Sequence, residues 1–218
     1  MAERWASFDC YGTLVDWRTG IGRELGRLLG EERRDELLER YYELEPIAQR
    51  DGSLSYREVL ARTLALVAAE AGTAVPDGEE DALARSLPSW PVFPEVSAAL
   101  TEARARGWRL AILSNTDPDL IAASVDAIGV PFGLVVAASA IGSYKPAHGH
   151  WQAFEREIGR PTDVHVGASV FHDVEPAVEL GLPTVWINRL GERAGVRPDR
   201  ELPDLASLPT VLDELVAA

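Results

Sequence analysis

The amino-acid sequence predicts an α/β protein: a doubly wound, Rossmann-like parallel sheet that carries an inserted helical cap domain. Five short apolar runs, each ending in a polar or glycine-containing turn, alternate with helical patterns along most of the chain. This alternation is typical of βαβ units, whose strands form a parallel sheet with helices on both faces. The one interruption, between the first two runs, has a purely helical pattern.

The five apolar runs are the expected strands of the sheet. Each has the length of a strand and stops where turn-forming residues begin. The expected strands cover residues 4–9, 109–114, 134–139, 164–170 and 183–189. The expected helices of this part cover residues 95–107, 118–129, 149–159, 175–181 and 208–218. Together these segments predict a core domain formed by residues 1–15 and 95–218.

Residues 16–94 are expected to form the helical cap domain. They contain no convincing strand pattern, and their amphipathic stretches predict helices over residues 21–30, 32–50, 55–72 and 78–87. The segment leaves the core directly after the first strand, so it would cover the carboxyl ends of the strands. Ligands of open α/β sheets bind at that edge, and a cap there would exclude water from the site.

Composition and charge restrict the function classes. The formal net charge of −14 disfavours nucleic acid as a partner, because a phosphate backbone needs a cationic surface. No apolar run approaches the roughly 20 residues that cross a membrane, and the start of the chain lacks a secretion-signal pattern. The single cysteine, Cys10, cannot form an internal disulfide. We therefore expect a cytoplasmic protein that acts on a small molecule.

Asp9 ends the first expected strand, and we interpret it as a nucleophilic carboxylate. The carboxyl ends of parallel strands form the ligand-binding edge of such a sheet. Gly12 allows a tight turn whose backbone N–H groups can bind an anion. Thr13 can hold one carboxylate oxygen while the other attacks. The alternative is that Asp9 only caps the next element.

Lys145 is the only lysine among the 21 lysine and arginine residues. This bias suggests a position where only a compact ammonium group works. The following Pro146 favours an extended backbone at Lys145. We expect the ammonium group to face Asp9 and to keep that carboxylate ionised. A solvated surface lysine is the alternative.

Two further strand ends carry polar residues. Ser114 and Asn115 follow the second strand and can orient an anion without adding net charge, although such a pair is also common in turns. Asp173 follows the fourth strand, where it could pair with Lys145 and orient or help to activate a water molecule. An N-cap for the helix near Glu175 is the alternative role of Asp173.

These strand-end motifs together resemble the haloacid dehalogenase superfamily. The stretches FDCYGTLVDW, LAILSNTD, GSYKPAHGHWQAF and GLPTVWINR are similar in particular to its 2-haloacid dehalogenase (type II) branch. The resemblance implies a two-step hydrolysis, in which Asp9 displaces halide from a 2-haloalkanoic acid and forms an aspartyl ester. Water then releases a 2-hydroxyalkanoic acid. A homodimer is also plausible from the resemblance.

The resemblance also implies roles for residues around Asp9. The backbone N–H groups of Cys10 and Tyr11, together with Ser114, would hold the substrate carboxylate. Asn115 and Arg40, an arginine of the cap in LLERYYELE, would hold the departing halide. For Arg40, a solvent-facing position on the helix is the alternative.

Two departures separate this chain from the phosphatases of the superfamily. Those enzymes carry a general acid two residues after the nucleophile, where Tyr11 stands here, and a magnesium ligand where Ala168 stands. Halide leaves without a proton, and Asp9 and Asp173 alone are few oxygen ligands for magnesium. We therefore expect no metal and no cofactor. A phosphatase with an altered metal site, and a ligand-binding member without turnover, are the alternatives.

Further departures concern the dehalogenase branch itself. That branch usually has a tyrosine where Trp151 stands, and a Ser-Ser-Asn-type stretch where this chain has Ala168, Ser169 and Val170. Ser169 or His172 is expected to compensate near the water site, a structural histidine being the alternative for His172. Tyr56 is the candidate aromatic wall of the halide pocket, with core packing as its alternative.

Overall fold

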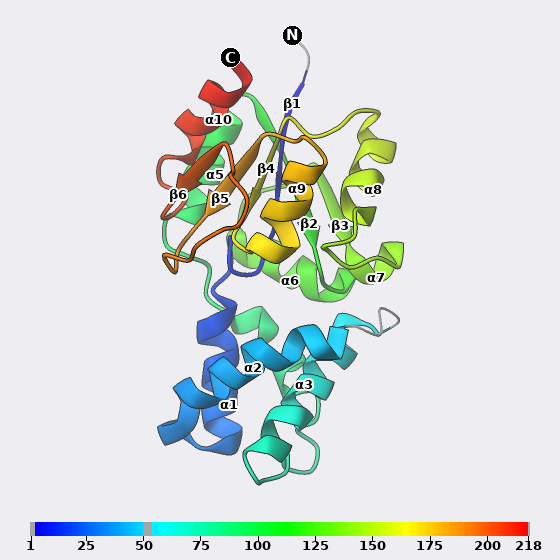
Figure 1. Ribbon diagram of the computed structural model, residues 1–218, viewed down its shortest axis with the longest axis vertical. Helices are drawn as coiled ribbons and strands as arrows, with labels where there is room; N and C mark the ends of the chain where they lie inside the picture. The colour runs from blue at the N-terminus through cyan, green and yellow to red at the C-terminus, as the bar shows by residue number, and fades with distance from the viewer. Residues whose placement is uncertain (1–2, 50–53, 218) are drawn as a thin grey trace.

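The computed structural model describes residues 3–49 and 54–217, and it shows one six-stranded parallel sheet in the order β3-β2-β1-β4-β5-β6 (Figure 1). The strands are β1 (Arg4–Phe8), β2 (Trp108–Ser114), β3 (Leu134–Ala137), β4 (Val164–Gly167), β5 (Thr184–Ile187) and β6 (Arg200–Leu202). Strand order reverses on either side of β1, as a doubly wound sheet requires. The predicted α/β fold is confirmed.

Helices cover both faces of this sheet. The core helices are α5 (Val96–Ala105), α6 (Pro118–Ile128), α7 (Ala138–Ile141), α8 (Gly149–Ile158), α9 (Glu175–Glu179) and α10 (Leu208–Ala217). Side chains of β1 alternate between the two faces of the sheet, so Trp5 and Phe8, three positions apart, lie on opposite faces. Phe8 belongs to the buried cluster shared with α5 and α10, whereas Trp5 belongs to the cluster shared with α8 and α9. This period of two explains why the strands are apolar throughout rather than alternating.

Three details differ from the sequence prediction. The third strand ends at Ala137, because α7 begins where residues 138 and 139 were expected to continue the strand. The fourth ends at Gly167 and is followed by η3 (Val170–Val174), a single π-helical turn. The edge strand β6 was missed, since its exposed sequence REL has no apolar run.

The segment between β1 and α5 is helical, and Figure 1 shows its helices as a separate layer beyond the sheet. Its helices are α1 (Trp17–Leu29), η1 (Glu31–Arg33), α2 (Arg34–Gln49), α3 (Tyr56–Glu70), α4 (Ala82–Ser86) and η2 (Leu87–Ser89). Residue 50, at the end of one expected helix, and residue 218, at the end of another, lie outside the described residues. Buried leucines and Tyr41 pack α1, α2 and α3 together.

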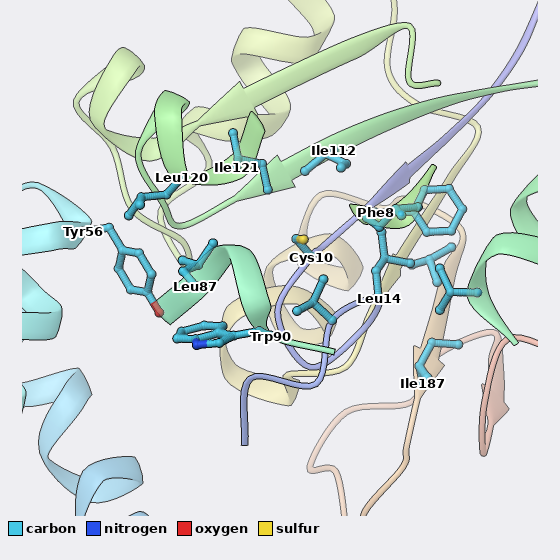
Figure 2. Close-up of a cluster of buried hydrophobic side chains, with 14 of the residues drawn as sticks. Phe8, Cys10, Leu14, Tyr56, Leu87, Trp90, Ile112, Leu120, Ile121 and Ile187 are labelled. Carbon is cyan, nitrogen blue, oxygen red and sulfur yellow. The ribbon is translucent and has the colours of Figure 1, made fainter. Parts of the chain in front are cut away.

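This helical layer is attached to the core beyond its two chain connections. The carboxylate of Asp117, after β2, accepts hydrogen bonds from the backbone N–H groups of Tyr56 and Arg57, each at 2.9 Å. Tyr56 also belongs to the buried cluster that contains Phe8 and Cys10 (Figure 2). The apolar core therefore continues from the sheet into the first turn of α3.

No helix within residues 3–49 and 54–217 is both long enough and apolar enough to cross a membrane.

Candidate active site

Asp9 occupies the first position after β1, at the carboxyl edge of the sheet. Its backbone N–H donates to the carbonyl oxygen of Val166 at 2.9 Å, which ties the strand end to β4. The hydroxyl group of Thr13 donates to Asp9 Oδ2 at 2.9 Å and accepts a hydrogen bond from the backbone N–H of Ala168 at 3.0 Å. Thr13 therefore holds one carboxylate oxygen of Asp9, as the sequence predicts, and the backbone of Ala168 in turn fixes the Thr13 hydroxyl group.

Lys145 lies between two carboxylates. Its side chain is almost fully buried, and its Nζ donates to Asp9 Oδ1 at 2.9 Å, to Asp173 Oδ1 at 2.6 Å and to the carbonyl oxygen of Leu113 at 2.8 Å. All three protons of the ammonium group thus have acceptors. The surface position considered for Lys145 is wrong.

The side-chain amide of Asn115 holds the backbone of Lys145. Its Nδ2 donates to the Lys145 carbonyl oxygen at 2.9 Å, and its Oδ1 accepts from the Lys145 N–H at 2.7 Å. Asn115 therefore positions the lysine, a contact that its place after β2 did not reveal. The carbonyl oxygen of Ser114, in turn, is bound by the buried ring of His150 at 3.0 Å.

The charges of this cluster shift the pKa values of its acids in opposite directions. Burial, together with repulsion from Asp173, raises the pKa of Asp9 to about 6. Burial alone would also raise the pKa of Asp173, but the Lys145 ammonium group and His165 hold it below its usual range. Since two carboxylates share one ammonium group, Asp9 is the acid that gains a proton more readily.

His165 is a member of the cluster that the sequence analysis missed. It is fully buried within β4, with Nδ1 at 2.9 Å from the Ser7 hydroxyl oxygen and Nε2 at 3.4 Å from Asp173 Oδ1. Burial lowers the pKa of His165, so its ring is neutral. The available signal was a histidine inside an otherwise apolar strand that is followed by the candidate residue Asp173.

A cavity of about 750 Å³ is lined by Asp9 and lies between the strand ends and the helical layer. Its floor includes Asp9, Ser114, Asn115, Lys145 and Asp173, and its other walls come from α1, α2, α3 and the segment after β5. Within the described residues, the buried Ser114 Oγ and Asp173 Oδ2 have no hydrogen-bond partner. Two unpaired polar atoms at one cavity indicate a site built for a polar ligand or water.

This arrangement is suited to covalent catalysis by a carboxylate. Asp9 is oriented by Thr13, faces a cavity, and lies beside a buried cation that can stabilise its reaction products. The profile of the haloacid dehalogenase-like hydrolases matches residues 4–181, which include every member of this cluster. The chain belongs to the haloacid dehalogenase-like hydrolase family.

Individual relatives agree with this assignment. An (S)-2-haloacid dehalogenase from Pseudomonas sp. (strain YL) is 29% identical to this hydrolase over 212 residues, which are 93% of this chain and 91% of that protein. A solved L-2-haloacid dehalogenase has 25% identity and a TM-score of 0.83, covering 98% of this chain and 100% of the other. The comparisons support the type II branch to which the motifs are similar.

The fold extends to more distant dehalogenases. The L-2-haloacid dehalogenase from Xanthobacter autotrophicus has a TM-score of 0.86 at 20% identity, over 98% of this chain and 99% of that one. At this identity the comparison concerns the fold alone. It places the sheet and the helical layer of this hydrolase in a known architecture.

The residues of this dehalogenase-like hydrolase do not fit a magnesium ion. Asp9 and Asp173 are already bridged by the Lys145 ammonium group, and Ala168 offers no side-chain ligand. Within the part of the chain that the structure describes, no three His, Cys, Asp or Glu side chains are grouped so as to hold a metal. A cation bound at the acids would have to displace Lys145.

The structure contradicts the expectation for Arg40. Its side chain is 43% exposed, pairs with Glu70 at 2.6 Å and with Glu43, and does not line the cavity. The residues of α2 that do line it are Tyr42, Glu45, Pro46 and Gln49, so Arg40 lies on another side of the helix. The solvent-facing alternative is the correct one.

The remaining candidates divide between the cavity and the core. Tyr56 lines the cavity and also packs in the core, so core packing is confirmed and its role as a wall of the halide pocket stays a prediction. Trp151 lies outside the lining, with its ring centroid 5.0 Å from that of His165. Ser169 and His172 line the cavity and contact each other, with Ser169 Oγ at 3.1 Å from His172 Nδ1. Burial lowers the pKa of His172 to about 4.

The side chains of the two residues after Asp9 differ in their surroundings, because Tyr11 lines the cavity and Cys10 does not. The Cys10 side chain is fully buried in the core, where burial raises the pKa of its thiol. The hydroxyl group of Tyr11 lies 3.1 Å from Ser124 Oγ, and its ring stacks on Tyr56. Tyr11 therefore replaces the phosphatase acid with an aromatic wall. Substrate binding by their backbone N–H groups stays a prediction.

Proposed function

We propose that this hydrolase is a metal-independent dehalogenase that converts 2-haloalkanoic acids to 2-hydroxyalkanoic acids. The observation that carries this proposal is the Asp9–Lys145–Asp173 cluster beside Tyr11. A nucleophile is present, but the acid that would protonate an alcohol is replaced by a tyrosine whose pKa burial raises. Such a site suits a leaving group that departs without a proton.

The first step forms a carbon–oxygen bond and breaks a carbon–halogen bond. An oxygen of Asp9 attacks the halogen-bearing carbon, and halide departs with the bonding electron pair, leaving an ester on Asp9. The unpaired hydroxyl of Ser114, with the backbone N–H groups of Cys10 and Tyr11, holds the substrate carboxylate. Lys145 keeps Asp9 ionised before the attack.

The second step hydrolyses the ester at the carbonyl carbon of Asp9. The unpaired Oδ2 of Asp173 orients the water and takes its proton as the new carbon–oxygen bond forms. Lys145 stabilises the oxyanion of the tetrahedral intermediate. Collapse of that intermediate breaks the ester carbon–oxygen bond, and the proton passes from Asp173 to the departing alkoxide oxygen, which releases the 2-hydroxy acid and restores Asp9.

Halide release is the direct test. We expect release from chloroacetate and from one or both enantiomers of 2-chloropropionate, unaffected by a chelator, and none from the Asp9→Asn variant. In single turnover in ¹⁸O-labelled water, the label should enter Asp9 rather than the product, because water attacks the aspartyl carbonyl. Faster magnesium-dependent hydrolysis of a generic phosphoester than halide release would overturn the proposal.

The organisation and setting of the protein form part of the same proposal. Residues 16–94 act as a cap over the core of residues 1–15 and 95–218, supported by the cavity between the two. The type II resemblance supports a homodimer, which size-exclusion chromatography with light scattering would test. The single, buried and unpaired Cys10 is consistent with a reducing, cytoplasmic setting.

A further inference from the structure

The wall of the cavity opposite Asp9 receives the leaving group. In an in-line displacement the halide departs from the side of the carbon opposite to the attacking oxygen, and Asp9 lies on the core side of the cavity, directly after β1. The halide therefore moves toward the helical layer, where α2 contributes Glu45 and α3 contributes Tyr56. The arginine expected at this wall is absent from it, since Arg40 lies at the surface.

Glu45 carries an acidic side chain that is held in place at this wall. The hydroxyl groups of Tyr41 and Tyr56 both donate to Glu45 Oε1, each at 3.2 Å. Burial raises the pKa of Glu45, and the two hydrogen bonds offset this only in part. Since Oε1 accepts from both tyrosines, the proton of the neutral acid resides on Oε2.

The cations near the cavity do not neutralise Glu45. Arg18 of α1 pairs with Glu39, and Arg189, after β5, donates to Glu95 at 2.6 Å and to the Thr13 carbonyl oxygen at 2.9 Å. On the core side, Lys145 is shared by Asp9 and Asp173. The cavity is also lined by five other ionisable side chains, Tyr11, Asp16, Tyr42, His172 and Glu192. An anion arriving in this cavity therefore favours the protonated form of Glu45.

We propose that Glu45, as a neutral carboxylic acid, donates a hydrogen bond to the departing halide. The inference rests on the proposed dehalogenase function and adds the group that receives its leaving group. The proton stays on Glu45 while halide takes the electron pair of the broken bond, so no further reactant is needed. Fluoride and chloride, with their higher charge density, gain more from this donor than bromide.

Three variants isolate the donor. Glu45→Gln keeps a hydrogen-bond donor that cannot ionise, and Glu45→Leu removes it. Glu43→Gln makes the same acid-to-amide change on α2 at an exposed position outside the cavity. We expect near-normal halide release for Glu45→Gln and Glu43→Gln, and a loss of about tenfold to a hundredfold for Glu45→Leu, larger with chloroacetate than with bromoacetate.

The pH dependence separates the acid from its amide. In wild type the donor is lost as the pH rises through the raised pKa of Glu45, whereas Glu45→Gln keeps it. Asp9, Asp173 and His172 titrate in both proteins, so the difference between the two curves reports Glu45. A melting-temperature shift with sodium bromide, at constant ionic strength, measures halide binding across the same pH range without turnover.

The outcomes distinguish this inference from the function on which it rests. Halide release with identical pH curves for wild type and Glu45→Gln, or unchanged rates for Glu45→Leu, would overturn the role of Glu45 and leave the dehalogenase. Bromide binding that weakens with rising pH only in wild type, without turnover of any haloacid, would support Glu45 and overturn the dehalogenase. Absence of both turnover and bromide binding would reject both.

Discussion

Replacing Lys145 by arginine tests the centre of the site. The substitution keeps the positive charge but exchanges a compact ammonium group, with three protons on one atom, for a larger planar guanidinium group. The Lys145 side chain is 1% exposed, and its Nζ meets Asp9, Asp173 and Leu113 within 2.9 Å. A guanidinium group cannot place donors at these three points from one nitrogen.

The contacts set the size of the effect. A hydrogen bond to a charged group contributes about 1.5–3 kcal/mol, so losing the two to Asp9 and Asp173 gives about 3–6 kcal/mol. At about 1.4 kcal/mol per factor of ten, kcat/KM falls by about a hundredfold to ten-thousandfold. The larger side chain overfills a buried position, which costs about 1–3 kcal/mol of unfolding free energy. The fold should survive this loss.

The assay combines initial rates of halide release with urea unfolding followed by tryptophan fluorescence. The matched control is Arg40→Lys, the reverse exchange at an exposed position, for which we expect wild-type rates and stability. A Lys145→Arg enzyme within about fivefold of wild type would refute the requirement for one compact ammonium group. An unfolded variant would instead refute the estimate of its packing cost.

Three further predictions follow from the contacts of the site. The kcat/KM for halide release should rise as the pH passes through about 6, because the raised pKa of Asp9 leaves this nucleophile protonated below that value. A rise in kcat/KM centred near pH 4 would contradict this prediction. Arg40→Ala should change halide-release rates less than twofold, since Arg40 and its partner Glu70 are outside the cavity lining. A large loss of rate would instead indicate that Arg40 holds the halide. Asp117→Ala should lower the unfolding free energy by about 1–3 kcal/mol in urea titrations, because the backbone N–H groups in the first turn of α3 lose their acceptor. The control Asp119→Ala, which removes an exposed ion pair, should change the unfolding free energy by less than about 1 kcal/mol.

The sequence predicted the elements whose local pattern is strong. The bounds of β1, β2 and α6 agree with the expected ranges to within a residue. The two strands were predictable because buried parallel strands are continuous apolar runs. The end of α6 was predictable because Gly129 closes the helix in the left-handed conformation. The edge strand β6 and the π-helical turn η3 carry no such pattern, since pairing with β5 and packing around Asp173 create them.

The contrast between Lys145 and Arg40 shows the limit of motif reasoning within the site. Lys145 precedes a proline after a strand of the core, and its position follows from the sheet, whose strand ends converge at one edge. Arg40 lies on a helix, where each residue rotates the side chain by about 100° around the axis, so its direction depends on how α2 packs. Tyr41 is buried between α2 and the other helices of its layer, and this packing turns Arg40 to solvent and Glu45 to the cavity.

By itself, the sequence determined that Asp9 and Ser114 lie at strand ends of one parallel sheet, and that Thr13, Lys145 and Asp173 lie in segments that follow its strands, because chain order and apolar periodicity set that arrangement. Only the tertiary structure decided which groups complete them. His165 contacts Ser7, and Asn115 contacts Lys145, in both cases between segments far apart in the chain. Burial beside Tyr41 and Tyr56 raises the pKa of Glu45, and this environment exists only once α2 and α3 have packed together.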